Sequence, residues 1–171
     1  DDDNDGILDA LECNSETFFW SNAPTLQSPV GGKSTTATGT INGINYTYTS
    51  SVAFDLTGNV FAIGEFPSSY GIPNQASVRN ERESQNTLSF DQPMTNPVLV
   101  FSSIGGGVPV SIQFYNDFTV LFQTQAIAGG GRVNIDEIDL VNQRITAQEG
   151  YVILRFNGTF SEINFDYLDD E

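Results

Sequence analysis

The chain has 171 residues, the size of one domain or of one domain with a small appendage. It carries 6 Lys+Arg against 22 Asp+Glu, a formal net charge of -16, with a single cysteine and no histidine. This composition excludes histidine-based triads, histidine metal ligands, an internal disulfide and a cysteine-rich zinc site. The excess of acid argues against nucleic acid and anionic membranes as partners, and it favours cations.

The acidic residues gather at the two ends of the chain. Residues 1–16 carry seven acids and no base, and residues 162–171 carry five acids and no base. The remaining 145 residues hold ten acids and all six bases, a net charge of -4. We therefore expect a domain over residues 17–171 with a weakly acidic body and an acidic C-terminal end, preceded by a distinct acidic segment over residues 1–16.

The first twelve residues have the spacing of a calcium-binding loop. Carboxylates stand at positions 1, 3, 5, 9 and 12, and Gly6 stands where such a loop turns sharply. Calcium requires six to eight oxygen ligands, and alternate residues of a tight turn can direct their oxygens to one ion. The expected ligands of Ca²⁺ are Asp1, Asp3, Asp5, the carbonyl of Ile7, Asp9 and Glu12.

No helix is predicted before or after this loop, so it is not a paired EF-hand sensor. It resembles a single thrombospondin type 3 calcium repeat, a motif found in series along bacterial surface proteins. The resemblance implies an extracellular protein in which calcium stiffens the junction between domains. Because residue 1 falls inside the motif, we expect a piece of a longer chain with neighbouring domains. No run of 18 apolar residues occurs, so we expect no membrane insertion.

From residue 17 onward the apolar residues alternate with a period of two, which predicts strands. Asn42-Gly43 and Asn157-Gly158 predict two-residue hairpins, and the glycine runs 105–107 and 129–131 mark further strand connections. The apolar run 98–101 predicts a strand that is buried on both faces. No helix is predicted; residues 135–141 fit a strand as well as a helix. The alternating segments are residues 44–48, 108–114, 118–122, 152–156 and 163–167.

This pattern predicts an all-β fold, an antiparallel β-sandwich or jelly roll preceded by the calcium loop. Three parts of the chain, residues 38–48, residues 90–99 and residues 149–151 followed by 156–163, also resemble the extracellular anchor-type β-sandwich modules of flavobacterial surface proteins. These modules occur beside calcium repeats in adhesins and polysaccharide-associated proteins. The resemblance implies the fold and a cell-surface location, and it brings no catalytic motif and no ligand.

The longest segment without strand character is residues 64–89, and long loops in compact domains often carry function. An aromatic ring, amides and arginines in this segment have the chemistry of a sugar site, and arginine suits an acidic or sulfated glycan. The alternative is a solvated loop without a ligand. The candidate ligand-binding residues are Tyr70, Asn74, Gln75, Arg79 and Arg82.

Two other features are ambiguous. Trp20 could be a binding platform, although a place in a strand of the core is the simpler interpretation. The acidic C-terminal residues could complete a second calcium site or form a linker. For an enzyme only a pair of carboxylates would be available, and nothing in the sequence marks such a pair.

The sequence therefore predicts a non-catalytic, calcium-stabilised extracellular adhesion module of a bacterial surface protein, with a glycan as its ligand. The alternative is a structural spacer or assembly module of a stalk or filament, with no ligand of its own. A third interpretation is a small glycoside-active enzyme.

Overall fold

The computed structural model describes residues 17–58, 66–105, 107–124 and 134–170. The predicted calcium loop and the glycine run 129–131 lie outside these described residues. The described elements, in chain order, are β1 (Thr25–Leu26), β2 (Ser34–Ile41), β3 (Ile44–Thr57), the 3-10 turn η2 (Ser68–Tyr70), β4 (Ser77–Arg79), β5 (Ser84–Thr95), β6 (Val98–Ile104), β7 (Val110–Phe114), β8 (Phe118–Gln123), β9 (Asn134–Asp139), β10 (Arg144–Phe156) and β11 (Thr159–Tyr167).

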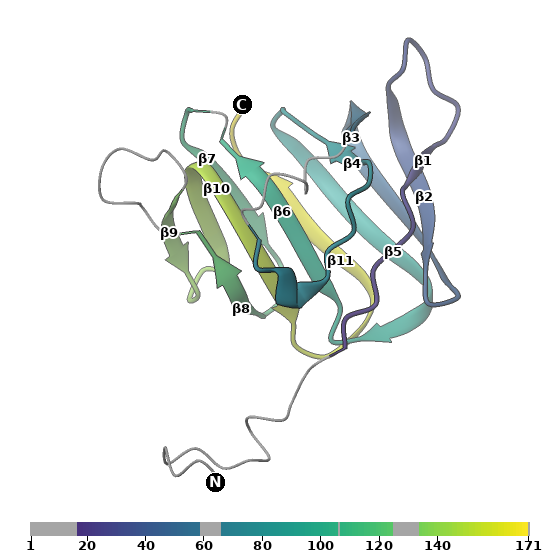
Figure 1. Cartoon of the computed structure of the whole chain (residues 1–171). Coiled ribbons are helices and arrows are strands. Elements are labelled where there is room, and N and C mark those ends of the chain that lie inside the picture. The colour runs from purple at the N-terminus through teal and green to yellow at the C-terminus, as the bar shows by residue number, and fades with distance from the viewer. Residues whose placement is uncertain (1–16, 59–65, 106, 125–133, 171) are drawn as a thin grey trace, which may run out of the picture.

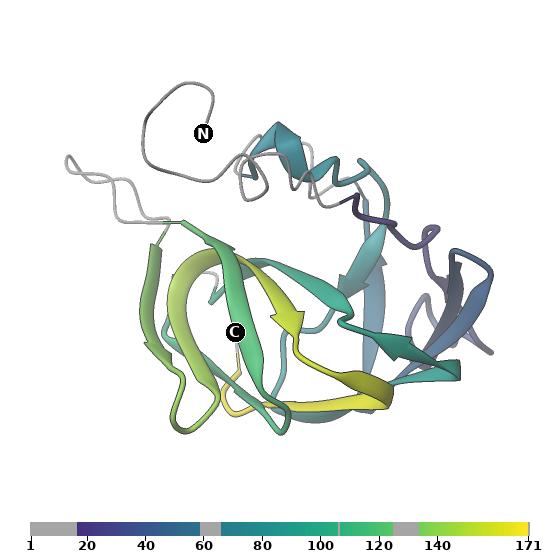
Figure 2. The same cartoon turned by 90° about the horizontal axis from the view of Figure 1, so that it is seen from below.

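The strands form an all-β sandwich in which every pair is antiparallel (Figure 1). The larger layer has the order β1-β2-β3-β5-β11-β7-β10-β9, and the smaller layer has the order β6-β10-β8. β10 belongs to both layers: its residues 144–149 pair with β7 and β9, and its residues 150–156 pair with β6 and β8. Figure 2 shows β10 curving from one layer into the other.

The bend in β10 follows from its sequence. The pairing register shifts between Gly150 and Val152, so a bulge accompanies the change of layer. Beyond the bend, residues 150–154 are all buried, which explains their nearly continuous apolar sequence. One face of this segment contacts the core, and the other is covered by Phe66, whose ring lies 5.6 Å from the ring of Tyr151.

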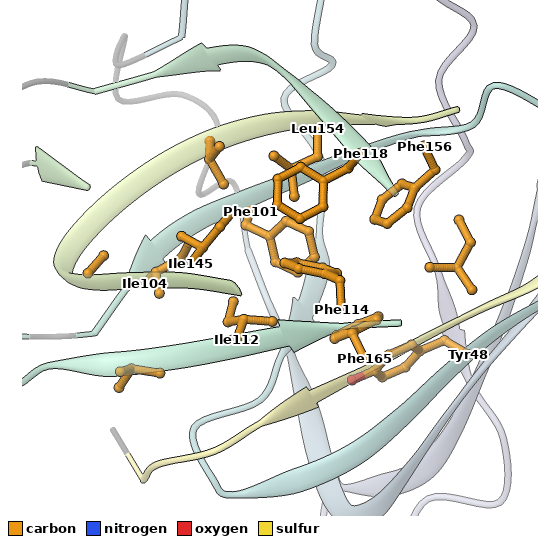
Figure 3. Packing of buried hydrophobic residues seen from close by; sticks show 14 of the residues in the cluster. Tyr48, Phe101, Ile104, Ile112, Phe114, Phe118, Ile145, Leu154, Phe156 and Phe165 are labelled. Atoms are coloured by element: carbon orange, nitrogen blue, oxygen red, sulfur yellow. The ribbon is translucent and has the colours of Figure 1, made fainter. Parts of the chain in front are cut away.

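The core lies between the smaller layer and the β7–β10–β11 part of the larger layer (Figure 3). Phe114 of β7 stands at its centre, with its ring 5.5 Å from that of Phe101, 5.2 Å from that of Phe118 and 5.6 Å from that of Phe156. Each of these side chains is almost fully buried, and such burial contributes about 1.5–3 kcal/mol per side chain. Because the smaller layer has fewer strands, it leaves the inner face of β3 and β5 without a facing strand.

The strands predicted from the sequence are present, and both hairpins connect the expected strands. Asn42 and Gly43 have φ angles of +47° and +82°, the left-handed backbone that a two-residue hairpin of type I′ requires. Two expectations are wrong. The segment 64–89 contains strand β4 and the start of β5. The run 98–101 lies in an edge strand, where only Phe101 is fully buried.

Candidate ligand-binding groove

A cavity of about 250 Å³ lies beside the core, over the inner face of β3 and β5, and we call it the inter-layer groove. Its floor is formed by β3, β5 and part of β11. One wall is β6, and the other is the segment that leads from η2 into β4. Its lining includes Trp20, Ser21, Ile41, Tyr46, Tyr48, Ile72, Pro73, Gln75, Ala76, Ser77, Val78, Asn80, Leu88, Phe90, Met94, Val98, Leu99, Val100, Phe101, Ser102 and Tyr167.

Among the residues that the structure describes, no charged side chain lines the groove. The chain has 22 Asp+Glu and 6 Lys+Arg, so an uncharged surface differs in character from the molecule as a whole. Apolar side chains form most of it, and its polar groups are amides and hydroxyls. The groove therefore suits an uncharged occupant that buries apolar surface and makes a few hydrogen bonds.

Cross-strand pairs form the floor. Tyr46 and Phe90 stand opposite each other, as do Tyr48 and Leu88, so that alternate residues of β3 and β5 face the groove. Gly39 of β2 makes room for the ring of Tyr46, because a Cβ at this position would overlap that ring. Burial raises the pKa of the Tyr46 phenol above its usual value.

Hydrogen bonds fix one wall to the N-terminal segment and to β8. The indole Nε1 of Trp20 donates to the carbonyl of Tyr70 at 2.9 Å, and Gln75 Nε2 donates to the carbonyl of Ser21 at 2.7 Å. The Tyr70 hydroxyl donates to the carbonyl of Leu121 in β8 at 2.7 Å. Phe18 packs on the rings of both Trp20 and Tyr70. These contacts hold residues 70–75 at the mouth of the groove.

A buried polar cluster fixes the other end of the same wall. The Asn80 amide nitrogen lies 2.9 Å from Ser84 Oγ, 3.1 Å from Asn86 Oδ1 and 3.2 Å from Ser50 Oγ. The Tyr48 hydroxyl donates to Asn86 Oδ1 at 2.6 Å. Burial raises the pKa of Tyr48 to about 12, against the opposing effect of its hydrogen bonds. The cluster anchors the chain between β4 and β5 onto β3.

The five predicted ligand residues do not form one site. Gln75 lines the groove, but its amide is bonded to Ser21, and Tyr70 is bonded to Leu121. Arg79 forms a bidentate ion pair with Asp55, with both N···O distances at 2.7 Å. Asn74 is exposed outside the groove, and Arg82 lines a separate shallow depression beside the C-terminal residues. Sequence reasoning thus placed one residue of five at the groove.

Trp20 does not lie in a strand of the core, so the simpler interpretation of this residue is wrong. It lies outside the strands, half-buried against Phe18, and it borders the groove. No signal in the sequence separates the other lining residues from the core, because Tyr46, Tyr48 and the run 98–101 have the apolar pattern of buried strands.

The predicted calcium ligands, residues 1–12, lie outside the described residues. Within the described ranges, no group of three or more acidic or cysteine side chains is placed to hold a metal ion. Three C-terminal acids accept hydrogen bonds instead: Asp166 from the Tyr115 hydroxyl, Asp169 from the Ser111 amide and Asp170 from the Glu83 amide. These contacts attach the acidic C-terminal segment to the sandwich.

Comparison with models of protein families, with curated proteins and with solved structures finds no match. Among the described residues, no helix is long and apolar enough to cross a membrane.

Proposed function

We propose that the chain is a non-catalytic adhesion module of an extracellular bacterial surface protein, stabilised by calcium and holding its partner in the inter-layer groove. The observation that supports this most is the uncharged, largely apolar lining of a groove that lies beside a complete core. Calcium at residues 1–12 would fit such a protein, because extracellular calcium modules bind the ion at the millimolar concentrations found outside cells.

The groove also restricts the charge of the glycan that the sequence predicts as a ligand. An acidic or sulfated glycan requires cationic partners, and the fork of Arg79 is already directed to Asp55. A glycan in the groove would therefore be neutral, bound by aromatic faces such as that of Trp20.

One observation supports the alternative, a structural spacer without a ligand. Tyr70, Gln75 and Arg79, three of the five residues with sugar-binding chemistry, are engaged in contacts within the domain. In a spacer these contacts would serve only to stiffen the segment between η2 and β5.

Adhesion of beads that carry the module, measured on cell surfaces and polysaccharide films in millimolar calcium, separates the two functions. Ile72→Lys places a charge in the groove, whereas Asn74→Lys adds the same charge to an exposed position two residues away. We expect the first variant to reduce adhesion at least tenfold and the second to retain it. Calcium-dependent self-association without any adhesion would support the spacer and contradict the proposal.

A further inference from the structure

β6 is an edge strand that borders the inter-layer groove. Among the described residues it pairs only with β10, and it stands at the end of the smaller layer. Six consecutive residues, 97–102, line the groove. Side chains alternate between the two faces of a strand, so a consecutive set can line one cavity only where that cavity meets the edge of the strand.

The pairing register shows which backbone groups point into the groove. The Phe156 amide donates to the carbonyl of Pro97 at 2.9 Å, so these two residues form a hydrogen-bonded pair. Hydrogen-bonded and non-hydrogen-bonded pairs alternate along an antiparallel ladder. Leu99 and Phe101 therefore bond to β10, whereas Val98 and Val100 direct their N–H and C=O groups away from it.

The opposite wall of the groove also ends in an edge. β4 pairs with β3 alone within the described part of the chain, and residues 75–78 form a second consecutive set of lining residues. The groove is thus a gap between the edge of the smaller layer and the edge of β4. A strand that pairs with the edge of β6 would therefore lie between these two walls.

The size and chemistry of the groove fit the side chains of such a strand. Its volume of about 250 Å³ is below the about 300–1,000 Å³ of pockets that enclose a whole small-molecule ligand. It can accommodate a few apolar side chains placed over Leu88 and Phe90, while the backbone of the strand pairs with the outward N–H and C=O groups of Val98 and Val100. A charged side chain would meet no opposite charge among the lining residues.

We infer that the groove accepts an extended segment of another polypeptide, with uncharged and alternately apolar residues, which adds as an extra strand to the edge of β6 that no described residue pairs with. Strand addition of this kind obtains affinity from main-chain hydrogen bonds and specificity from the pockets for alternate side chains. The inference rests on the proposed function, since it names the class of partner that the groove would hold.

The test uses a set of capped nonapeptides, Lys-Thr-X-Thr-X-Thr-X-Thr-Lys, in which X is valine, isoleucine, leucine or phenylalanine. Binding is followed by amide hydrogen exchange of the whole labelled chain in calcium. We expect members of the set to slow the exchange of the Val98 and Val100 amides at least tenfold, and the same peptides with a central proline to have no effect. Leu99 and Phe101, already bonded to β10, should change little.

Two variants provide a matched control. Val100→Pro removes the outward N–H without breaking a bond to β10, and proline is tolerated on the open side of an edge strand. It should weaken peptide binding at least tenfold, whereas Val100→Thr, which keeps the N–H and the β-branched shape, should bind within threefold of the wild type. The hydrogen-exchange measurement uses the wild-type chain, so the test does not depend on whether Val100→Pro folds.

The inference is overturned if no peptide protects the two amides, or if Val100→Pro binds as well as Val100→Thr. It is also overturned if the amides are protected in the free protein by the chain's own residues, or at high concentration by a second copy. The two proposals can fail separately. If Ile72→Lys loses adhesion and the module binds neutral glycans, but no peptide binds, the strand partner is refuted and the proposed function is retained.

Discussion

Replacing Asn80 with alanine should lower the free energy of unfolding by about 2 kcal/mol. The Asn80 amide nitrogen carries two hydrogens, and four acceptors lie between 2.9 and 3.5 Å from it: Ser84 Oγ, Asn86 Oδ1, Ser50 Oγ and the Tyr48 hydroxyl. At most two of these contacts can be full hydrogen bonds at one time. Each contributes about 1 kcal/mol net in a partly buried site. The bond from the Arg82 amide to Asn80 Oδ1 is exposed and adds little.

Thermal unfolding and urea titration measure this loss. In a chain of this length, about 2 kcal/mol corresponds to a fall in Tm of about 4–8 °C. Asn74→Ala is the matched control, because Asn74 is an exposed asparagine of the same segment and forms no hydrogen bond within the described residues. It should change the free energy of unfolding by less than about 0.5 kcal/mol. Equal effects of the two substitutions would show that the polar cluster does not anchor the segment between β4 and β5.

Three further predictions concern the turn after β6, the buried tyrosine and calcium. Gly105 and Gly107 share a φ of +100°, but a Cβ at Gly105 would overlap the carbonyl oxygen of Ala147, whereas a Cβ at Gly107 would meet open space. In urea titration, Gly105→Ala should therefore lower the free energy of unfolding by about 3 kcal/mol or more, and Gly107→Ala should lower it by about 1 kcal/mol. Burial raises the pKa of Tyr48 from 10.0 to about 12, so the folded state holds the phenol proton more tightly than the unfolded chain does. About 2–3 kcal/mol of stability that is present below pH 10 should therefore be lost as the pH rises to 12. The difference in unfolding free energy between the wild type and Tyr48→Phe isolates this loss, and a difference that does not change with pH would contradict it. Calcium at a hundredfold excess over its Kd should stabilise the folded chain by about 2.7 kcal/mol, measured by thermal unfolding. A chelator, or the double substitution Asp3→Ala with Asp5→Ala, should remove this stabilisation. A melting temperature that does not respond to chelation would refute a calcium site linked to folding.

The parts of the fold that the sequence could predict are those that depend on local chemistry. The alternation of apolar residues along β3, β7 and β11 is visible in the sequence because one face of each strand is buried. The hairpin at Asn42-Gly43 is visible because few other residues adopt its left-handed backbone. β4 gives no such signal, because a strand of three residues is too short to show an alternation of apolar residues; among the described residues it pairs only with β3.

The groove could not be predicted because it depends on pairings between distant parts of the chain. Tyr70 has the chemistry of a sugar platform in sequence, but its hydroxyl is used by the carbonyl of Leu121, 51 residues away. Likewise, the apolar run 98–101 suggests a central strand, and only the pairing of β10 with both β6 and β8 shows that it lies at an edge. The apolar character of this run is explained by the groove beside it, since Val98 and Val100 are only half-buried.

An accessible edge on β6 is the claim on which the role of the groove depends most, and amide hydrogen exchange of the unliganded chain tests it directly. We predict alternation along β6, with fast exchange at Val98 and Val100 and slow exchange at Leu99 and Phe101, because only the latter pair bonds to β10. Uniformly slow exchange at all four amides would mean that the edge is already occupied, and it would contradict an open groove.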